Sequence, residues 1–127
     1  MERRIFYVDG VGTMLFGLVG VVWPSLFLSM FATRPFPALA LDMTSWLSLF
    51  LAMFGYLQWR CASYGLEAVK LFHRAAFVAD LIFPYVFFSL MRRGGTFTFA
   101  AFVVILYHFW LTWHRWKVVR RPELLLS

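Results

Sequence analysis

The sequence predicts an all-α integral membrane protein, an antiparallel bundle of four transmembrane helices. Four long apolar runs support this prediction: residues 10–33, 43–59, 75–91 and 94–114. About 20 apolar residues are enough to cross a bilayer as a helix. Of the 127 residues, 62% are hydrophobic and 14% are charged, which is too apolar for a soluble domain of this size. Continuous apolar runs also disfavour a β-barrel, so residues 1–127 are expected to form one helical transmembrane domain.

Lysine and arginine residues gather on one side of such a bundle. Threading the chain four times through a bilayer places most of them on one side: Arg3, Arg4, Arg60, Lys70, Arg74, Arg115, Lys117, Arg120 and Arg121. The other side receives Arg34, Arg92 and Arg93. The positive-inside rule then puts both termini on the cytoplasmic or matrix side of a bacterial or mitochondrial inner membrane. The net charge of +6 is explained by this orientation, and no nucleic-acid partner is expected.

The first helix is expected over residues 6–31. Its small residues recur in steps of three and four along one face: Gly10, Thr13, Gly17 and Gly20. In lipid, small residues allow two helix backbones to approach closely, so this face is expected to pack on another helix. Pro24, which follows Trp23, is expected to kink or end the helix.

The other three helices are expected over residues 39–59, 71–91 and 96–116, with a basic tail over 117–127. The second helix carries its own small stripe at four-residue spacing: Thr44, Ser48 and Ala52. Arg92, Arg93, Gly94 and Gly95 form a short connection, which predicts that the third and fourth helices are antiparallel neighbours. Little chain remains outside the membrane, so function is expected within it, at its surface or against a neighbouring protein.

Ionisable residues inside membrane helices indicate either function or interhelical contact, because an unpaired charge is costly there. Asp80 and His108 are both about 12–13 Å from the inner ends of their helices. The sequence therefore predicts an Asp80–His108 hydrogen bond. It could belong to a proton relay or a quinone-polarising site. Interhelical glue is favoured, because a relay needs a chain of such groups across the bilayer.

A second group of polar residues shares a depth near the inner surface: Asp9, His73, Arg74 and His114. An Asp9–Arg74 ion pair linking the first and third helices is the simplest arrangement. His73 and His114 could instead be axial ligands of one haem. No cofactor is predicted outright. Quinone, haem or another tetrapyrrole is the alternative, with His73, His108 and His114 as the binding residues. The sequence has no metal-binding Cys/His cluster, nucleophile elbow or phosphate loop.

The layout resembles that of DoxX-like small four-helix membrane proteins. The resemblance consists of Asp9-Gly10 opening a glycine-rich first helix, then Trp23-Pro24 and a short second helix. It implies a four-helix bundle, sometimes associated with quinone-linked redox partners. No functional residue is carried over from it.

Two functional hypotheses follow. The first is a non-catalytic small membrane subunit that packs against other membrane subunits, or against itself, and stabilises or helps assemble a larger complex. It depends on the lack of a catalytic residue set and on the small-residue faces of two helices, and it favours a role other than that of an enzyme. The second is a redox or ligand-binding membrane protein that uses the inner-half Asp and His residues.

Overall fold

The structure, a computed structural model, describes residues 2–32, 35–92, 98–121 and 123. The regular elements are all helices: α1 (Glu2–Val22), α2 (Pro24–Ser29), α3 (Ala38–Cys61), α4 (Leu66–Arg92) and α5 (Phe99–Arg120). No strand occurs among the described residues, so the all-α prediction is confirmed. The expected connection through Arg93, Gly94 and Gly95, the expected helix start at Thr96 and most of the tail beyond residue 121 lie outside the described residues.

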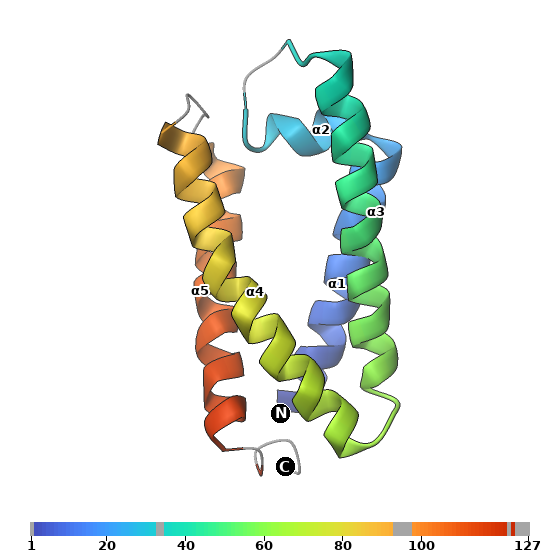
Figure 1. Cartoon of the computed structure of the whole chain (residues 1–127), viewed down its shortest axis with the longest axis vertical. Coiled ribbons are helices and arrows are strands. Elements are labelled where there is room, and N and C mark those ends of the chain that lie inside the picture. Colours follow the sequence, from blue (N-terminus) through green and yellow to red (C-terminus); the bar gives the residue numbers. More distant parts are fainter. Residues whose placement is uncertain (1, 33–34, 93–97, 122, 124–127) are drawn as a thin grey trace.

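The four long helices form two pairs. α1 packs along α3, and α4 packs on α5 (Figure 1). Successive long helices run in opposite directions, so the start of α1, the Ala62–Gly65 connection and the end of α5 lie at one end of the molecule. We call this the basic end, because arginine and lysine residues flank the helices there. The short helix α2 lies across the opposite end, which we call the far end (Figure 1).

Several helix bounds differ from the expected ones, beginning with α1, which starts at Glu2. The expected helix over 6–31 is interrupted at Trp23, where φ is −136° and ψ is 63°, and Pro24 starts α2. The interruption expected at Pro24 is therefore present, since proline has no N–H for the helix to use. α4 begins at Leu66, and α5 continues to Arg120 through much of the expected basic tail.

The backbones of α1 and α3 are in contact through small residues. A Cβ atom added to Gly10 would lie 2.7 Å from the backbone nitrogen of Trp59, and one added to Gly17 would lie 2.7 Å from the Cα atom of Ala52. On α3, Gly55 has the same role, because its added Cβ atom would lie 2.7 Å from the carbonyl oxygen of Gly10. Such contacts leave no room for larger side chains, so the α1–α3 spacing depends on these residues.

The other residues of the expected small-residue faces also lie on α1 and α3. Gly20 faces the side chain of Ser48, and Ser48 and Ala52 are buried on α3. Thr44 is buried and donates its hydroxyl hydrogen bond to the carbonyl of Ala40, 2.7 Å away. Thr13 is half-buried.

Apolar packing between the two helix pairs is concentrated near the two ends. At the basic end, the buried residues Phe6, Ala62, Val69 and Val118 form one cluster. At the far end, Ala101 and Ile105 of α5 pack with Phe31. Thr98 caps α5 there by accepting from the Ala101 N–H, and its hydroxyl donates to the carbonyl of Met30. The segment after α2 is thereby attached to the start of α5.

Among the described residues, two helical segments are long and apolar enough to cross a membrane: Arg4–Val22 and Ala38–Cys61. A core helix of a soluble protein can satisfy the same criterion, but it would be mostly buried. Here only 28% of the apolar window in the first segment and 22% of that in the second are buried. Large apolar side chains such as Val22, Leu39 and Trp46 are well exposed on them.

Candidate functional site: a buried charge cluster

Asp9 is the centre of a polar cluster in the interior of the molecule. It lies on α1 and is only 3% exposed. Three side chains donate hydrogen bonds to its carboxylate. Gln58 Nε2 lies 2.5 Å and Arg115 Nη2 2.6 Å from Oδ2, and the Tyr107 hydroxyl lies 2.7 Å from Oδ1. These donors come from α3 and α5, so a single carboxylate connects α1 to both.

Arg115 joins a second carboxylate to the same cluster. Its Nε atom lies 3.1 Å from Oδ2 of Asp80 on α4, which is within ion-pair distance. The N–H is not aligned for a hydrogen bond, and Oδ2 has no hydrogen-bond partner among the described residues. Asp9, Asp80 and Arg115 are all buried. With both carboxylates ionised, the cluster holds two negative charges and one guanidinium. One excess negative charge therefore remains in a low-dielectric interior.

Gln58 is the residue of the cluster that lies deepest, with no exposed surface. Its Nε2 group donates to the Asp9 carboxylate and, at 3.0 Å, to the carbonyl oxygen of Phe6. Both hydrogens of the amide nitrogen are therefore used. The sequence analysis did not select this residue. A signal was present, because Gln58 continues the small-residue stripe of α3 three residues beyond Gly55.

Arg115 was also not expected in the interior. The sequence analysis counted it among the basic residues that flank the fourth helix, which was expected to end at residue 116. Because α5 continues to Arg120, Arg115 lies more than one turn inside the helix and faces the two carboxylates. We call Asp9, Gln58, Asp80, Tyr107 and Arg115 the charge cluster.

The structure therefore gives two expected pairs different partners. Asp9 was expected to pair with Arg74, but its cation is Arg115, and the Arg74 side chain is exposed. Asp80 was expected to contact His108, and its cation is also Arg115. His108 is half-buried, with Nδ1 2.9 Å from the carbonyl oxygen of Val104 in its own helix. An arginine offers several donors in a fixed planar arrangement, which suits contact with two carboxylates at once.

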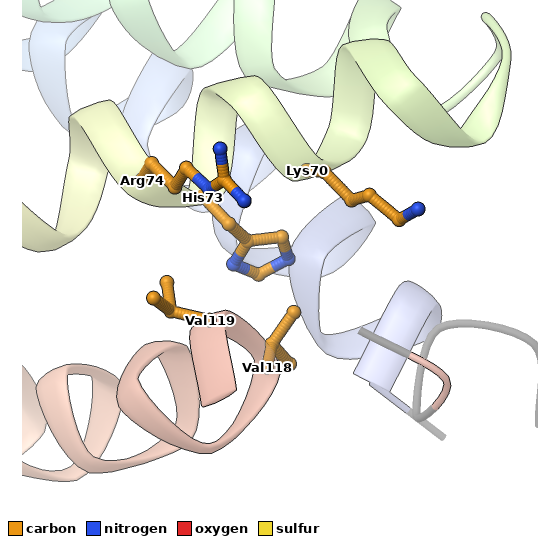
Figure 2. A pocket seen from close by; sticks show the side chains of 5 residues that line it. All are labelled: Lys70, His73, Arg74, Val118 and Val119. Carbon is orange, nitrogen blue, oxygen red and sulfur yellow. The ribbon is translucent and has the colours of Figure 1, made fainter. Parts of the chain in front are cut away.

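His73 lies beside the charge cluster on α4. It is 5% exposed, and its ring packs on the ring of Phe6 with centroids 4.4 Å apart. Neither ring nitrogen has a hydrogen-bond partner within the part of the chain that the structure describes. Figure 2 shows the ring directed into a small pocket between α4 and α5.

His114, the other expected haem ligand, lies on α5. Its ring contacts that of Trp110, with centroids 4.5 Å apart. His73, His108 and His114 thus have different aromatic or backbone neighbours, and a haem or quinone site at these residues stays a prediction. Among the described residues, no group of three His, Cys, Asp or Glu side chains lies close enough together to hold a metal ion.

The chemistry that the charge cluster offers is electrostatic. It holds one carboxylate with three donors and one guanidinium between two carboxylates, supplied by α1, α3, α4 and α5. Breaking a buried pair by removing one partner typically destabilises a protein by about 3–5 kcal/mol, because the other charge is left uncompensated. The cluster can therefore fix the relative positions of the two helix pairs.

Comparisons with protein-family models, with curated proteins and with solved structures find no match to this chain. The resemblance to DoxX-like proteins accordingly rests on the sequence layout alone.

Proposed function

We propose that this chain is a multi-pass membrane protein in which α1, α3, α4 and α5 cross the bilayer, with the basic end on the cytoplasmic or matrix side. The exposed apolar surface supports this placement. Tyr85 is 76% exposed and Leu71 70% exposed on α4, and Phe99 is 81% exposed on α5, while Asp9, Asp80 and Arg115 are buried. Apolar groups outside and charges inside are the reverse of a water-soluble protein, and they suit a lipid environment.

Within that membrane, we propose that the chain is a non-catalytic subunit that packs against other membrane proteins and stabilises or helps assemble their complex. One observation carries this proposal: among the described residues, the donors to Asp9 and the carboxylates at Arg115 join α1, α3, α4 and α5 to one another. The most polar part of the interior is thus engaged in holding helices together. The connection between α3 and α4, residues 62–65, is also short, and the helix surfaces that would face lipid offer a large area for contact with partners.

Mild solubilisation of native membranes, followed by native electrophoresis and mass spectrometry, tests the subunit proposal. We expect the chain to migrate in a large complex with a reproducible set of membrane proteins. An Arg115→Met variant should leave that complex, whereas Arg121→Met, at an exposed arginine near the end of α5, should remain in it. A discrete monomer or dimer for the parent chain would contradict the proposal.

The second candidate is a redox or ligand-binding membrane protein. The specific observation in its favour is His73, which is buried, faces a pocket and has two ring nitrogens without a hydrogen-bond partner among the described residues. An absorption spectrum of the purified protein with a Soret band, or an extracted quinone, would support this candidate over the subunit proposal.

A further inference from the structure

The pocket between α4 and α5 at the basic end has two different walls. Lys70, His73 and Arg74 of α4 form one wall, and Val118 and Val119 of α5 form the other (Figure 2). The pocket is small and partly open: the empty space of about 190 Å³ beside these residues includes space outside the protein, and the enclosed part is about 10 Å³. Positions 70, 73 and 74 are three and four residues apart, so one helix face presents two cationic side chains and an imidazole together.

His73 is the observation that points to a ligand. Buried polar groups in proteins nearly always have a hydrogen-bond partner, and an exception calls for an unseen partner such as a water molecule or an ion. Both ring nitrogens of His73 lack a partner within the described part of the chain, although the residue is 95% buried. Figure 2 shows the ring between Lys70 and Arg74 and facing the two valines. A ligand in the pocket would be within reach of the imidazole.

The charged residues around the pocket favour a negatively charged ligand. Arg74 is exposed. Among the described residues, Lys70 is paired with Glu67, 2.7 Å away and itself 85% exposed, which is a weak surface pair. The nearby carboxylates of Asp9 and Asp80 are engaged by Arg115. The first turn of α4 also lies at this end, and a helix N-terminus favours negative charge. The pocket lining thus includes two cationic residues and an imidazole, with the exposed acid Glu67 beside Lys70.

The apolar wall and the surroundings indicate the kind of anion. Val118 and Val119 offer no hydrogen bonds, so a ligand with an apolar portion next to its charge fits better than a fully hydrated ion. On α5, Lys117 lies over the ring of Trp113 at 5.2 Å and Arg120 over that of Trp116 at 4.6 Å. Tryptophan and basic residues together are typical of the level of lipid headgroups.

We propose that Lys70, His73 and Arg74 form a binding site for a phosphate group, supplied by the headgroup of an anionic phospholipid. The phosphate chemistry rests on the pocket alone, whereas the lipid source rests on the proposed membrane placement. Lys70 and Arg74 provide the charge, His73 provides a buried hydrogen-bonding group, and the valines contact the glycerol region of the lipid.

Native mass spectrometry of the detergent-purified full chain tests this site, with phosphatidylglycerol, phosphatidylcholine and inorganic phosphate as the added probes. We expect the parent chain to retain phosphatidylglycerol in preference to phosphatidylcholine. The double variant Lys70→Gln/Arg74→Gln should reduce that preference about tenfold. The matched control Arg4→Gln/Arg121→Gln removes two exposed arginines outside the pocket and should change it less than about twofold. Equal losses in the two double variants would overturn the proposal, because bulk charge alone would explain them.

Two further arms separate the role of His73 and the source of the phosphate. His73→Phe keeps an aromatic ring beside Phe6 and should lower the preference for phosphatidylglycerol, whereas the control His114→Phe should not. An unchanged preference in His73→Phe would show that the imidazole does not contribute to binding. If His73→Phe fails to fold, the lysine–arginine pair still decides the outcome. Saturable binding of inorganic phosphate that the pocket variant abolishes would identify a soluble source and overturn the lipid assignment. Failure of every probe to bind the parent chain would overturn the site itself, while leaving the subunit proposal intact.

Discussion

Arg115 Nη2 lies 2.6 Å from Oδ2 of Asp9, although 106 residues separate the two along the chain. The pair connects the first and last helices, and both residues are buried. Because Arg115 also contacts Asp80, this one side chain joins α5 to both α1 and α4.

Replacing Arg115 with methionine should destabilise the protein severely. The change leaves the buried carboxylates of Asp9 and Asp80 without their cation, and the expected loss of unfolding free energy is about 3–5 kcal/mol. Unfolding in mixed detergent micelles, followed by circular dichroism, measures it. Arg121→Met, at an exposed position, is the matched control and should lie within about 0.5 kcal/mol of the parent. Equal stability of the two variants would show that the Arg115 pairs contribute nothing.

The two carboxylates should respond differently to neutralisation. Asp9 accepts three hydrogen bonds from described residues, whereas Oδ2 of Asp80 has no hydrogen-bond partner among them and makes an ion-pair contact with Arg115. Asp80→Asn also removes the excess negative charge of the cluster. We expect Asp80→Asn to stay within about 1 kcal/mol of the parent and Asp9→Asn to be clearly less stable. A double-mutant cycle of Asp9→Asn with Arg115→Met measures the coupling directly. If Asp80→Asn proves the more damaging change, Asp80 rather than Asp9 is the main partner of Arg115.

Gln58 and Tyr107 provide a graded comparison of donors to the same carboxylate. Gln58→Leu removes two hydrogen bonds from a fully buried position and should lower the unfolding free energy by about 1–3 kcal/mol. Tyr107 is 42% exposed and donates one hydrogen bond to Asp9, so Tyr107→Phe should have a smaller effect. The same unfolding measurement ranks the two variants, and the reverse order would contradict the geometry of the cluster.

Two glycine substitutions test the α1–α3 contact. Gly55→Ala places a methyl group against the backbone of α1 near Gly10 and Met14, and should destabilise the protein by about 1–3 kcal/mol through overpacking. Gly12→Ala is the matched control, because nothing lies within 4 Å of its added Cβ atom. That change should be neutral or stabilising by up to about 1 kcal/mol, from helix propensity alone. A harmless Gly55→Ala would mean that the two helices are farther apart than described.

Cysteine labelling tests the proposed orientation. In a Cys61→Ser background, Ser63→Cys lies in the connection at the basic end and Pro35→Cys lies near the far end, and both positions are exposed. An impermeant maleimide added to intact cells or mitoplasts should label Pro35→Cys and should reach Ser63→Cys only after the membrane is opened. Labelling of Ser63→Cys alone in sealed samples would invert the proposed topology.

Local sequence patterns predicted the helices better than their contacts. Apolar run length and proline position gave the long helices and the interruption after Trp23, because these depend on neighbouring residues only. The contact partner of Asp9 depends on the rotation of α5 about its axis and on where that helix ends. The expected helix ended four residues early, at 116 against Arg120, so Arg115 was interpreted as a charge flanking the helix.

The histidine predictions show the same limit. Depth along a helix was correct enough to group Asp9 with His73, whose ring lies against the neighbouring Phe6. Depth alone could not decide whether Arg74 or Arg115 pairs with Asp9. That choice depends on the rotation of α4 and α5 about their axes, which determines which arginine faces inward. The small-residue stripe carried that rotational information for α1 and α3, and the hydrophobic α5 had no comparable stripe.

The shared use of Arg115 has a consequence for biosynthesis. In the proposed membrane placement, the helices enter in order from the N-terminus, so α1 and α3 can associate through their glycines while Asp9 has only Gln58 as a side-chain donor among the contacts described. The arrival of α4 adds a second carboxylate, Asp80, and α5 then brings both Tyr107 and Arg115. A nascent chain that stops before residue 115 therefore displays two acids with no cation between them. Quality-control proteases that recognise uncompensated intramembrane charge could distinguish it from the finished chain by that difference.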